Sequence, residues 1–438
     1  MDDDGAAPLQ APRRRGGLWH HAGFRRLWIG ETVSQFGTEI SQLALPLVAI
    51  LVVHASTFQV GLLTALQTVA FAVISLPVGA WVERMRFRSV LVVNDLIRAL
   101  ALGSIPLAAA LGGLTIGQLY LVAVVTGICT VFFDVAYQSF LPGLVGRDGI
   151  VEGNARLQAS QSVSQMAGPS LGGLLIQALT APYAILLDAV SFLWSAGWVT
   201  AIKLPPARRE PPPQRHLGRE ITEGLRFVVA NPMLRAIAMC TGSFNLFSSM
   251  VSAVFYVLLA RDLHLSAGVI GLITATAAVG GVAGALVATK VAARLGQGPA
   301  IWISVAVTGP CAFAAPFVHD DWTLAVLAAA QIGLGAGGVI YNIIQVSFRQ
   351  GLCPPRLLGR MNATMRFLVW GTMPLGGLLG GALGSALGVR PTLLVAAIGE
   401  SLVFIPVLAS PLRHAHELPS YQDPSSSPPT VTNPTPPS

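Results

Sequence analysis

Charged residues are scarce in this sequence. Only 11% of its 438 residues are charged, whereas about 25% is typical of soluble proteins. At that frequency roughly 110 charges would be expected, and the chain carries 27 basic and 20 acidic side chains. Apolar residues make up 53% of the chain, and its mean hydropathy is +0.65. The composition therefore excludes a soluble enzyme and a disordered chain, and it indicates a protein that crosses a membrane several times.

Cysteine and lysine are also scarce. The four cysteines (Cys129, Cys240, Cys311 and Cys353) lie far apart without a histidine partner, which excludes a disulfide-stapled domain and predicts no metal or redox cofactor. The net charge of +7 comes almost entirely from 25 arginines. A basic chain can bind nucleic acid, but cytoplasmic loops of membrane proteins also concentrate basic residues, and we favour that interpretation. No phosphate-binding loop or Ser–His–Asp arrangement is visible, so neither ATP-driven transport nor an enzyme is expected.

Long apolar runs account for most of the chain. A helix needs about 20 apolar residues to cross a bilayer, and twelve such runs are present. With the N-terminus inside, 24 of the 27 basic residues fall in cytoplasmic loops or at the cytoplasmic ends of spans, so both termini are predicted to be cytoplasmic. The predicted spans are 27–53, 60–82, 89–111, 119–141, 157–179, 183–203, 236–260, 267–289, 299–318, 322–346, 361–386 and 391–411.

An internal repeat divides the chain into two halves. At an offset of 208 residues, eight identities relate 127–155 to 335–363, and Gly61–Ala65 matches Gly271–Ala275 at a slightly different offset. The sequence thus predicts an all-α polytopic protein with twelve transmembrane helices in two pseudo-symmetric six-helix bundles. The predicted parts are a cytoplasmic segment 1–23, a first bundle 24–203, a cytoplasmic linker 204–231, a second bundle 232–412 and a disordered cytoplasmic tail 413–438.

Two glycine-containing motifs occur in the first half. The segment between the second and third spans contains Gly79, Glu83, Arg84 and Arg88, and the fifth span contains Gly168-Pro169-Ser-Leu-Gly172-Gly173. Proline bends a helix, and small residues allow helices to cross closely. Each motif also has a simpler interpretation: the first as a positive-inside loop, and the second as a kink that serves helix packing. The sequence also contains Phe24-Arg-Arg-Leu-Trp, Asp95-Leu-Ile-Arg98, Phe133-Asp134-Val-Ala-Tyr and Asp188-Ala-Val-Ser-Phe.

With these motifs, residues 20–412 resemble the major facilitator superfamily, and in particular its drug/proton antiporter branch, which includes macrolide and enterobactin exporters. The resemblance implies the major facilitator fold, a bacterial plasma membrane and alternating access. It also implies that the 79–88 segment latches the halves on the cytoplasmic side, and that the Gly168–Gly172 motif accompanies antiport. The sequence departs from the family pattern by carrying Glu83 where aspartate is usual and Arg86 where a second glycine is common.

Charged residues inside the spans are the main functional signal, since each costs roughly 2.5–3.5 kcal/mol to insert at mid-helix. On the first span, Glu31, Gln35, Thr38 and Gln42 share one face at 100° per residue, and Glu39 lies about 80° away. These residues are predicted to line a central cavity. Transfer of a carboxylate out of water favours its protonated form, so Glu39 first, and Glu31 second, are candidates for proton coupling. Glu31 would otherwise be a hydrated interfacial residue about one turn inside the span.

Other polar residues inside the spans have less specific roles. Asp95 and Arg98 are three residues apart and can form an ion pair that Asp134 joins; we interpret this cluster as a structural pair or as part of a proton relay and gate. Candidate substrate contacts, for which ordinary packing is the alternative, are Gln35, Gln42, Asn245, Tyr341 and Gln345. Asp188, Arg366 and Glu400 receive no role.

The sequence therefore predicts a secondary active transporter in a bacterial plasma membrane, in which protons drive the export of a hydrophobic or amphipathic small molecule. The first alternative is a proton symporter or facilitative uptake carrier with the same fold. A membrane-embedded enzyme or lipid-handling protein would need a catalytic cluster that the sequence does not show. The expected partners are the substrate, protons and the lipid bilayer, and the protein is expected to be a monomer with no cofactor other than the proton gradient.

Overall fold

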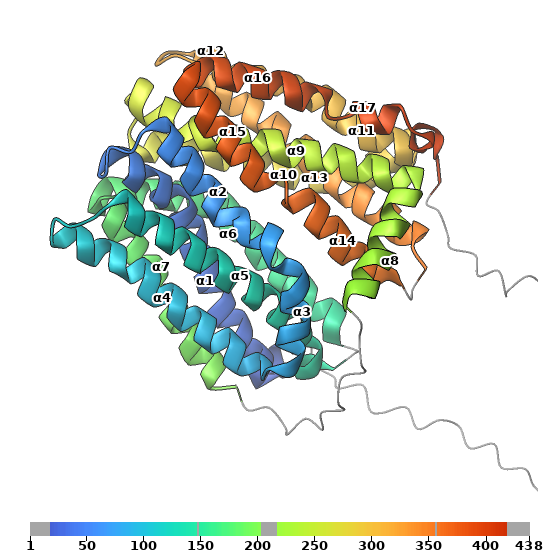
Figure 1. Ribbon diagram of the computed structural model, residues 1–438, viewed down its shortest axis with the longest axis horizontal. Coiled ribbons are helices and arrows are strands. Elements are labelled where there is room, and N and C mark those ends of the chain that lie inside the picture. The colour runs from blue at the N-terminus through green and yellow to red at the C-terminus, as the bar shows by residue number, and fades with distance from the viewer. Residues whose placement is uncertain (1–17, 147–148, 203–216, 355–356, 418–438) are drawn as a thin grey trace, which may run out of the picture.

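A computed structural model describes residues 18–146, 149–202, 217–354 and 357–417, and helices account for nearly all of these residues. No strand occurs within these ranges. The helical elements, shown in Figure 1, are η1 (Leu18–His20), α1 (Ala22–Leu51), α2 (Thr57–Val73), α3 (Ser75–Arg84), α4 (Phe87–Ala110), α5 (Ile116–Val145), α6 (Ile150–Leu179), α7 (Ala181–Thr200), α8 (Leu217–Ala230), α9 (Pro232–Val257), η3 (Leu258–Asp262), α10 (Ala267–Leu295), α11 (Gln297–Thr308), η4 (Gly309–Phe313), α12 (Ala314–Phe317), α13 (Thr323–Leu352), α14 (Leu358–Trp370), α15 (Met373–Ala386), α16 (Val389–Leu402), α17 (Ile405–Leu408) and η6 (Pro411–His414).

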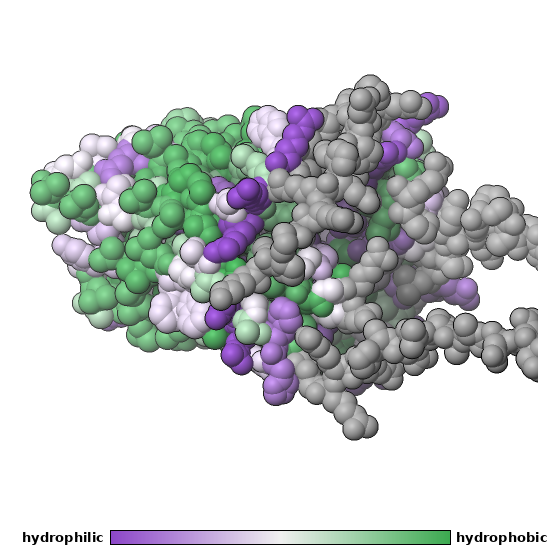
Figure 2. Space-filling model, turned by 90° about the horizontal axis from the view of Figure 1, so that it is seen from below, coloured by the Kyte–Doolittle hydropathy of each residue, from purple (hydrophilic) through white to green (hydrophobic). Residues whose placement is uncertain are grey.

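The outer surface is apolar. Leu100 and Leu286 have 75% and 73% of their surface exposed, and hydrophobic residues cover a broad area of the face shown in Figure 2. An exposed apolar surface of this extent indicates contact with lipid. Among the described helical segments, nine are long and apolar enough to cross a membrane, and Thr57–Val73 is a shorter apolar helix. The protein is therefore a multi-pass membrane protein.

The helices pack as two groups. Figure 1 shows α1–α7 in one half of the molecule and α9–α17 in the other. At the end where α1 and α9 finish, which we call the closed end, one hydrophobic cluster contains residues of both halves, such as Leu47 and Val254. Toward the opposite, open end, separate clusters form around Phe24 in the first half and Phe348 in the second. The halves are thus joined by a common core at the closed end.

Glycines allow the two halves to approach closely at the closed end. A Cβ on Gly61 of α2 would lie 2.4 Å from the Cα of Gly381 on α15, and Figure 1 shows these two helices side by side. A Cβ on Gly271 of α10 would lie 2.3 Å from the Pro169 oxygen and 3.0 Å from the Gly173 Cα, both on α6. Gly61 and Gly271 are equivalent positions of the internal repeat. Repeat-related glycines thus each form a close contact between the halves at this end.

The structure corrects three local predictions. Glu83 and Arg84 lie in the last turn of the helix α3, not in a loop. The segment 204–231, predicted to be a charged linker, includes the amphipathic helix α8, whose Val228 is buried. Part of the predicted disordered tail is ordered, because backbone amides of α11 donate hydrogen bonds to the carbonyls of Ala415 and His416 at 2.7 and 3.1 Å. Residues 1–17 and 418–438 lie outside the described ranges.

Candidate functional site

A cavity of about 770 Å³ lies among α1, α4, α5 and α6, with rings from α2 and α14 completing its wall. We call it the acidic cavity because three carboxyl groups line it. Its other lining residues are mainly amides, hydroxyls and aromatic rings. The residues that line the acidic cavity are Glu31, Ser34, Gln35, Thr38, Glu39, Gln42, Phe71, Arg98, Thr130, Phe133, Asp134, Tyr137, Asn154, Ala155, Leu157, Gln158, Gln161, Gln165 and Trp370.

Helix α1 supplies the largest polar group to this cavity. All five polar residues predicted to face it (Glu31, Gln35, Thr38, Glu39 and Gln42) are present in its wall. Residues four apart lie on the same face of a helix, and the Gln35 amide donates a hydrogen bond to the Glu31 carboxylate at 3.2 Å. Because α1 begins at Ala22, nine residues before Glu31, that carboxyl lies about 13 Å along the helix.

Glu39 occupies a position that depends on a neighbouring glycine. A Cβ on Gly168 of α6 would lie 2.4 Å from the Glu39 Cβ and 3.0 Å from its Cγ, so a side chain there would occupy the same space. Gly172, one turn later, similarly approaches the Ile40 Cα at 3.3 Å. The carboxyl of Glu39 lines the cavity and receives no hydrogen bond or ion pair from the described residues. The Gly168–Gly172 motif thus brings α6 against α1 beside this acid.

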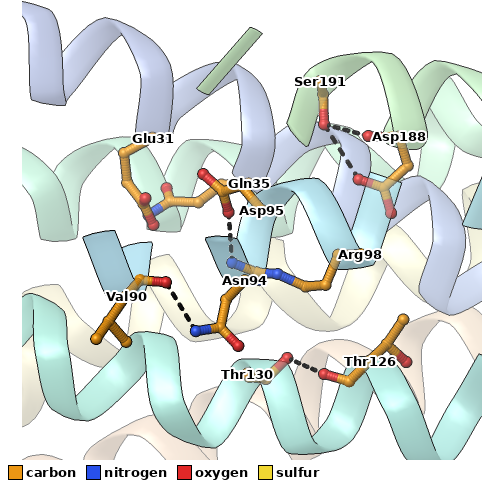
Figure 3. A network of polar contacts seen from close by, with 10 residues as sticks. All are labelled: Glu31, Gln35, Val90, Asn94, Asp95, Arg98, Thr126, Thr130, Asp188 and Ser191. Atoms are coloured by element: carbon orange, nitrogen blue, oxygen red, sulfur yellow. Dashed lines mark hydrogen bonds and ion pairs between the residues drawn. The ribbon is translucent and has the colours of Figure 1, made fainter. Parts of the chain in front are cut away.

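Asp95 and Arg98 form the predicted ion pair on α4. The Arg98 guanidinium donates to the Asp95 carboxylate at 2.6 Å, and Asp95 is fully buried (Figure 3). The guanidinium also lies over the rings of Phe133 and Phe192, at 4.5 and 4.2 Å from their centroids. These contacts fix Arg98 in the wall of the acidic cavity. The pair therefore places a neutralised charge at the cavity surface, whereas Glu31 and Glu39 have no cationic partner at ion-pair distance among the described residues.

Asp134 does not hydrogen-bond to this pair. Its carboxylate on α5 accepts a hydrogen bond from Arg366 on α14 at 2.7 Å, which joins the two halves. The Arg366 guanidinium lies 4.4 Å from the centroid of the Trp370 ring, and Trp370 contacts Phe71 of α2 edge to face at 4.7 Å. Sequence reasoning gave Arg366 no role, because its partner lies 232 residues away.

The wall of the cavity includes residues that sequence analysis did not select. Gln158, Gln161 and Gln165 of α6 line it together, and their spacing of three and four residues is the signal that could have revealed them. A second cavity of about 400 Å³ adjoins the first, since Thr38, Gln42, Phe71, Arg98 and Thr130 line both. We call this second cavity the central cavity. Asp188 of α7 lines it and accepts a hydrogen bond from Ser191 at 3.1 Å (Figure 3).

Three predicted substrate contacts lie elsewhere. The Asn245 amide donates to the Val369 carbonyl at 2.8 Å, which joins α9 to α14. Tyr341 is buried, and its hydroxyl lies 2.6 Å from that of Thr241. Gln345 is also buried and donates to Asn342 at 3.1 Å. None of the three lines the acidic or central cavity, because their faces of α9 and α13 pack within the second half.

Gly79, Arg84 and Arg88 are the predicted latch residues whose surroundings the structure describes, and no hydrogen bond or ion pair from Arg84 or Arg88 reaches the second half among the described residues. A Cβ on Gly79 would have no neighbour within 4 Å, and Arg84 is exposed. Arg88 donates a hydrogen bond to the Thr200 carbonyl at the end of α7, within its own half. The side chain of Glu83 lies outside what the structure describes. Among the described residues, an ion pair between Asp134 and Arg366 joins α5 to α14, and one between Glu223 and Arg360 joins α8 to α14 at 2.5 Å.

The family model described as transmembrane secretion effector, of the major facilitator type, matches residues 18–434. The chain belongs to the transmembrane secretion effector family. This membership confirms the resemblance to the major facilitator superfamily.

Curated relatives of this family member are exporters. This chain is 25% identical over 343 residues to the enterobactin exporter EntS of Citrobacter koseri, and the alignment covers 78% of this chain and 80% of EntS. It is 26% identical over 377 residues to the multidrug efflux pump Tap of Mycolicibacterium fortuitum, and this alignment covers 81% of this chain and 89% of Tap. The family and these relatives are membrane transporters, so this chain is a membrane transporter and not an enzyme.

Solved structures show the same fold. The nucleoside transporter NupG superposes with a TM-score of 0.74 at 12% identity, over 88% of this chain and 98% of NupG. A bacterial homologue of the iron transporter ferroportin in the inward-facing state superposes with a TM-score of 0.71 at 16% identity, over 88% of this chain and 98% of that protein. At these identities the likeness establishes the major facilitator fold alone.

Proposed function

We propose that the protein exports a hydrophobic or amphipathic small molecule from a bacterial cell in exchange for protons, by alternating access of the cavities between its halves. The observation that carries the proposal is the acidic cavity, in which Glu31 and Glu39 face a space lined by amides and aromatic rings. Two relatives that are 25% and 26% identical to this chain are exporters, which supports outward transport. The carboxyls supply groups that can bind a proton or release it.

The proposed topology has twelve membrane spans with both termini in the cytoplasm. Three segments (α1, α2 with α3, and α6) fall outside the nine that qualify by length and composition. Two of these, α1 and α6, supply most of the polar wall of the acidic cavity, which lowers their hydropathy without exposing polar groups to lipid. The open end carries most of the described arginines, including Arg25, Arg84 and Arg294, which supports the proposal that this end faces the cytoplasm.

The proposed coupling uses the two acids of α1. A carboxyl group in contact with water ionises, and removal from water favours its neutral form. Closure around Glu39 and Glu31 on one side of the membrane, followed by hydration from the other side, therefore changes their affinity for protons. Asp134 contributes a further charge, because its protonation would remove one partner of the ion pair with Arg366 that joins the halves.

Proteoliposomes with an imposed pH gradient test this proposal. The probes are a panel of fluorescent amphipathic compounds, and the compound and proton fluxes are recorded together. Antiport predicts that a compound moves against the direction of proton flow, and that a protonophore abolishes its accumulation. Glu39→Gln and Glu31→Gln should each reduce gradient-driven transport toward the rate of empty liposomes.

The matched control is Asp320→Asn, which removes an exposed acid in the segment between α12 and α13. This variant should transport as the wild type does. Compound and proton moving in the same direction would instead establish symport. Full gradient-driven activity in both α1 variants would refute the assignment of coupling to these acids.

A further inference from the structure

A third cavity lies within the second half of the protein. Its volume is about 290 Å³, and residues of α9, α10, α13 and α16 line it. It meets the central cavity at Ser248, Ser252 and Tyr256, which line both. Glu400 of α16 is the acidic residue of this cavity, and no lysine, arginine or histidine is present among its lining residues. We call it the Glu400 cavity.

Close packing on two sides holds Glu400 in place. A Cβ on Gly309 would lie 3.0 Å from the Glu400 carbonyl oxygen, so η4 contacts the backbone of α16 at this residue. A Cβ on Gly399 would lie 2.3 Å from the ring of Phe247, so α9 packs against the preceding residue. Glu400 itself is 6% exposed. These contacts fix the backbone of α16 at this position.

No described cation neutralises Glu400. Its carboxyl has no hydrogen bond or ion pair with the residues that the structure describes. The nearby helices α9 and α16 and the π-helical turn η3 carry Arg235, Arg390 and Arg261, and each of these donates to a backbone carbonyl instead: that of Val229, Pro316 and Ala55, respectively. An unpaired buried carboxylate is unfavourable. A positively charged group that enters the cavity would supply the missing partner and stabilise the ionised form of Glu400.

The remaining wall suits the body of an organic cation. Phe244, Phe255 and Tyr256 line the cavity, and the Phe255 and Tyr256 rings meet edge to face with centroids 6.0 Å apart. Aromatic faces attract ammonium groups, most strongly where water is excluded. The volume lies at the lower limit of ligand pockets, about 300 Å³, so the Glu400 cavity accommodates a head group. The rest of the molecule would extend past Tyr256 into the central cavity.

We propose that Glu400, with Phe244, Phe255 and Tyr256, forms a binding site for the ammonium group of an amphipathic organic cation. Glu400 lies outside the acidic cavity that holds the acids of α1, and binding at this site requires no proton gradient. It goes beyond the proposed function by assigning a ligand class and a second charged position, in the half of the molecule opposite Glu39 and Glu31. An anionic ligand would be repelled at this position.

Calorimetric titration of the full-length protein in detergent tests the site. The probe is 4-phenylbutyltrimethylammonium, with 4-phenylbutanol and 4-phenylbutyrate as neutral and anionic counterparts. We expect the wild type to bind the cation at least about tenfold more tightly than the alcohol, as one ion pair in an aromatic cavity can provide. Glu400→Gln should abolish this preference and leave the affinity for the alcohol unchanged. Asp320→Asn, which changes an exposed acid, should retain it.

Labelling of the wild type provides a second measurement that needs no variant at Glu400. Dicyclohexylcarbodiimide modifies carboxyl groups in apolar surroundings, and mass spectrometry locates the product. The cation should protect Glu400 from modification, whereas the alcohol should not. Equal labelling with and without the cation, or equal affinity of the wild type and Glu400→Gln for it, overturns the proposal. Because binding is measured without a gradient, such a failure leaves proton antiport unaffected.

Discussion

Asp134 and Arg366 form an ion pair between the two halves of the molecule, with 2.7 Å between the carboxylate oxygen and the guanidinium nitrogen. The pair lines the wall of the acidic cavity through Asp134, and Arg366 stacks on Trp370 beside it. Asp134 is a candidate proton-binding residue, and its ion pair holds the two halves together. Protonation of Asp134 would therefore weaken a contact between the halves.

Double-mutant analysis of this pair should give a modest coupling energy. Asp134→Asn and Arg366→Gln each remove one charge, and the two side chains are 35% and 27% exposed. Partly exposed ion pairs contribute about 0.2–1 kcal/mol, so we expect coupling in that range from the thermal unfolding of the four proteins. Arg366→Lys should retain the charge and lose part of the stacking on Trp370. Strict additivity of the two single variants would contradict a direct interaction.

The pair between Asp95 and Arg98 should behave differently, because both side chains are buried. Loss of one partner leaves the other as an uncompensated charge, which typically costs about 3–5 kcal/mol. Arg98→Gln should therefore strongly lower the unfolding temperature, and the double variant Asp95→Asn/Arg98→Gln should recover much of the loss. If the double variant is as unstable as the sum of the single variants, the pair does not act as a unit.

Gly168→Ala should destabilise the contact between α1 and α6. The added methyl would lie 2.4 Å from the Glu39 Cβ, and overpacking of this kind costs about 1–3 kcal/mol. Gly197→Ala is the matched control, since a Cβ there has no neighbour within 4 Å and alanine favours a helix. Thermal unfolding should show a loss for the first variant and no loss for the second. Equal stability of both variants would show that α1 and α6 separate without cost.

Gly271→Ala should weaken the closed end. Its methyl would lie 2.3 Å from the Pro169 oxygen on the other half of the molecule. A reporter cysteine at Ser252, in the wall of the central cavity, measures the effect in a Cys311→Ser background, because Cys311 itself lines the adjacent cavity. In vesicles that present the closed end outward, Gly271→Ala should increase labelling by a membrane-impermeant maleimide.

The control for that experiment is Gly113→Ala, which adds a methyl in open space between α4 and α5. It should leave the labelling rate of the reporter unchanged. Unchanged labelling in Gly271→Ala as well would mean that this glycine contact does not seal the closed end. Increased labelling in both variants would assign the effect to general loosening of the fold.

Local spacing determined much of what the sequence revealed. The polar face of α1 and the Asp95–Arg98 pair follow from 100° per residue and from a separation of three, so both could be predicted without knowledge of neighbouring helices. The repeat predicted equivalent glycines at Gly61 and Gly271, although not what they would contact. The amphipathic helix α8 was missed because the linker was interpreted by charge alone.

The rest was decided by how the helices are rotated and where they cross. Asp134 pairs with Arg366 across 232 residues, and Glu400 faces a cavity because η4 and α9 fix α16 in one orientation. Tyr341 and Gln345 are polar residues within a span, as Gln35 and Gln42 are, yet packing within the second half buries them. The sequence by itself determined which faces of the helices are polar. Only the tertiary structure decided which of those faces meet a cavity, because that depends on side-chain packing between helices far apart in the chain.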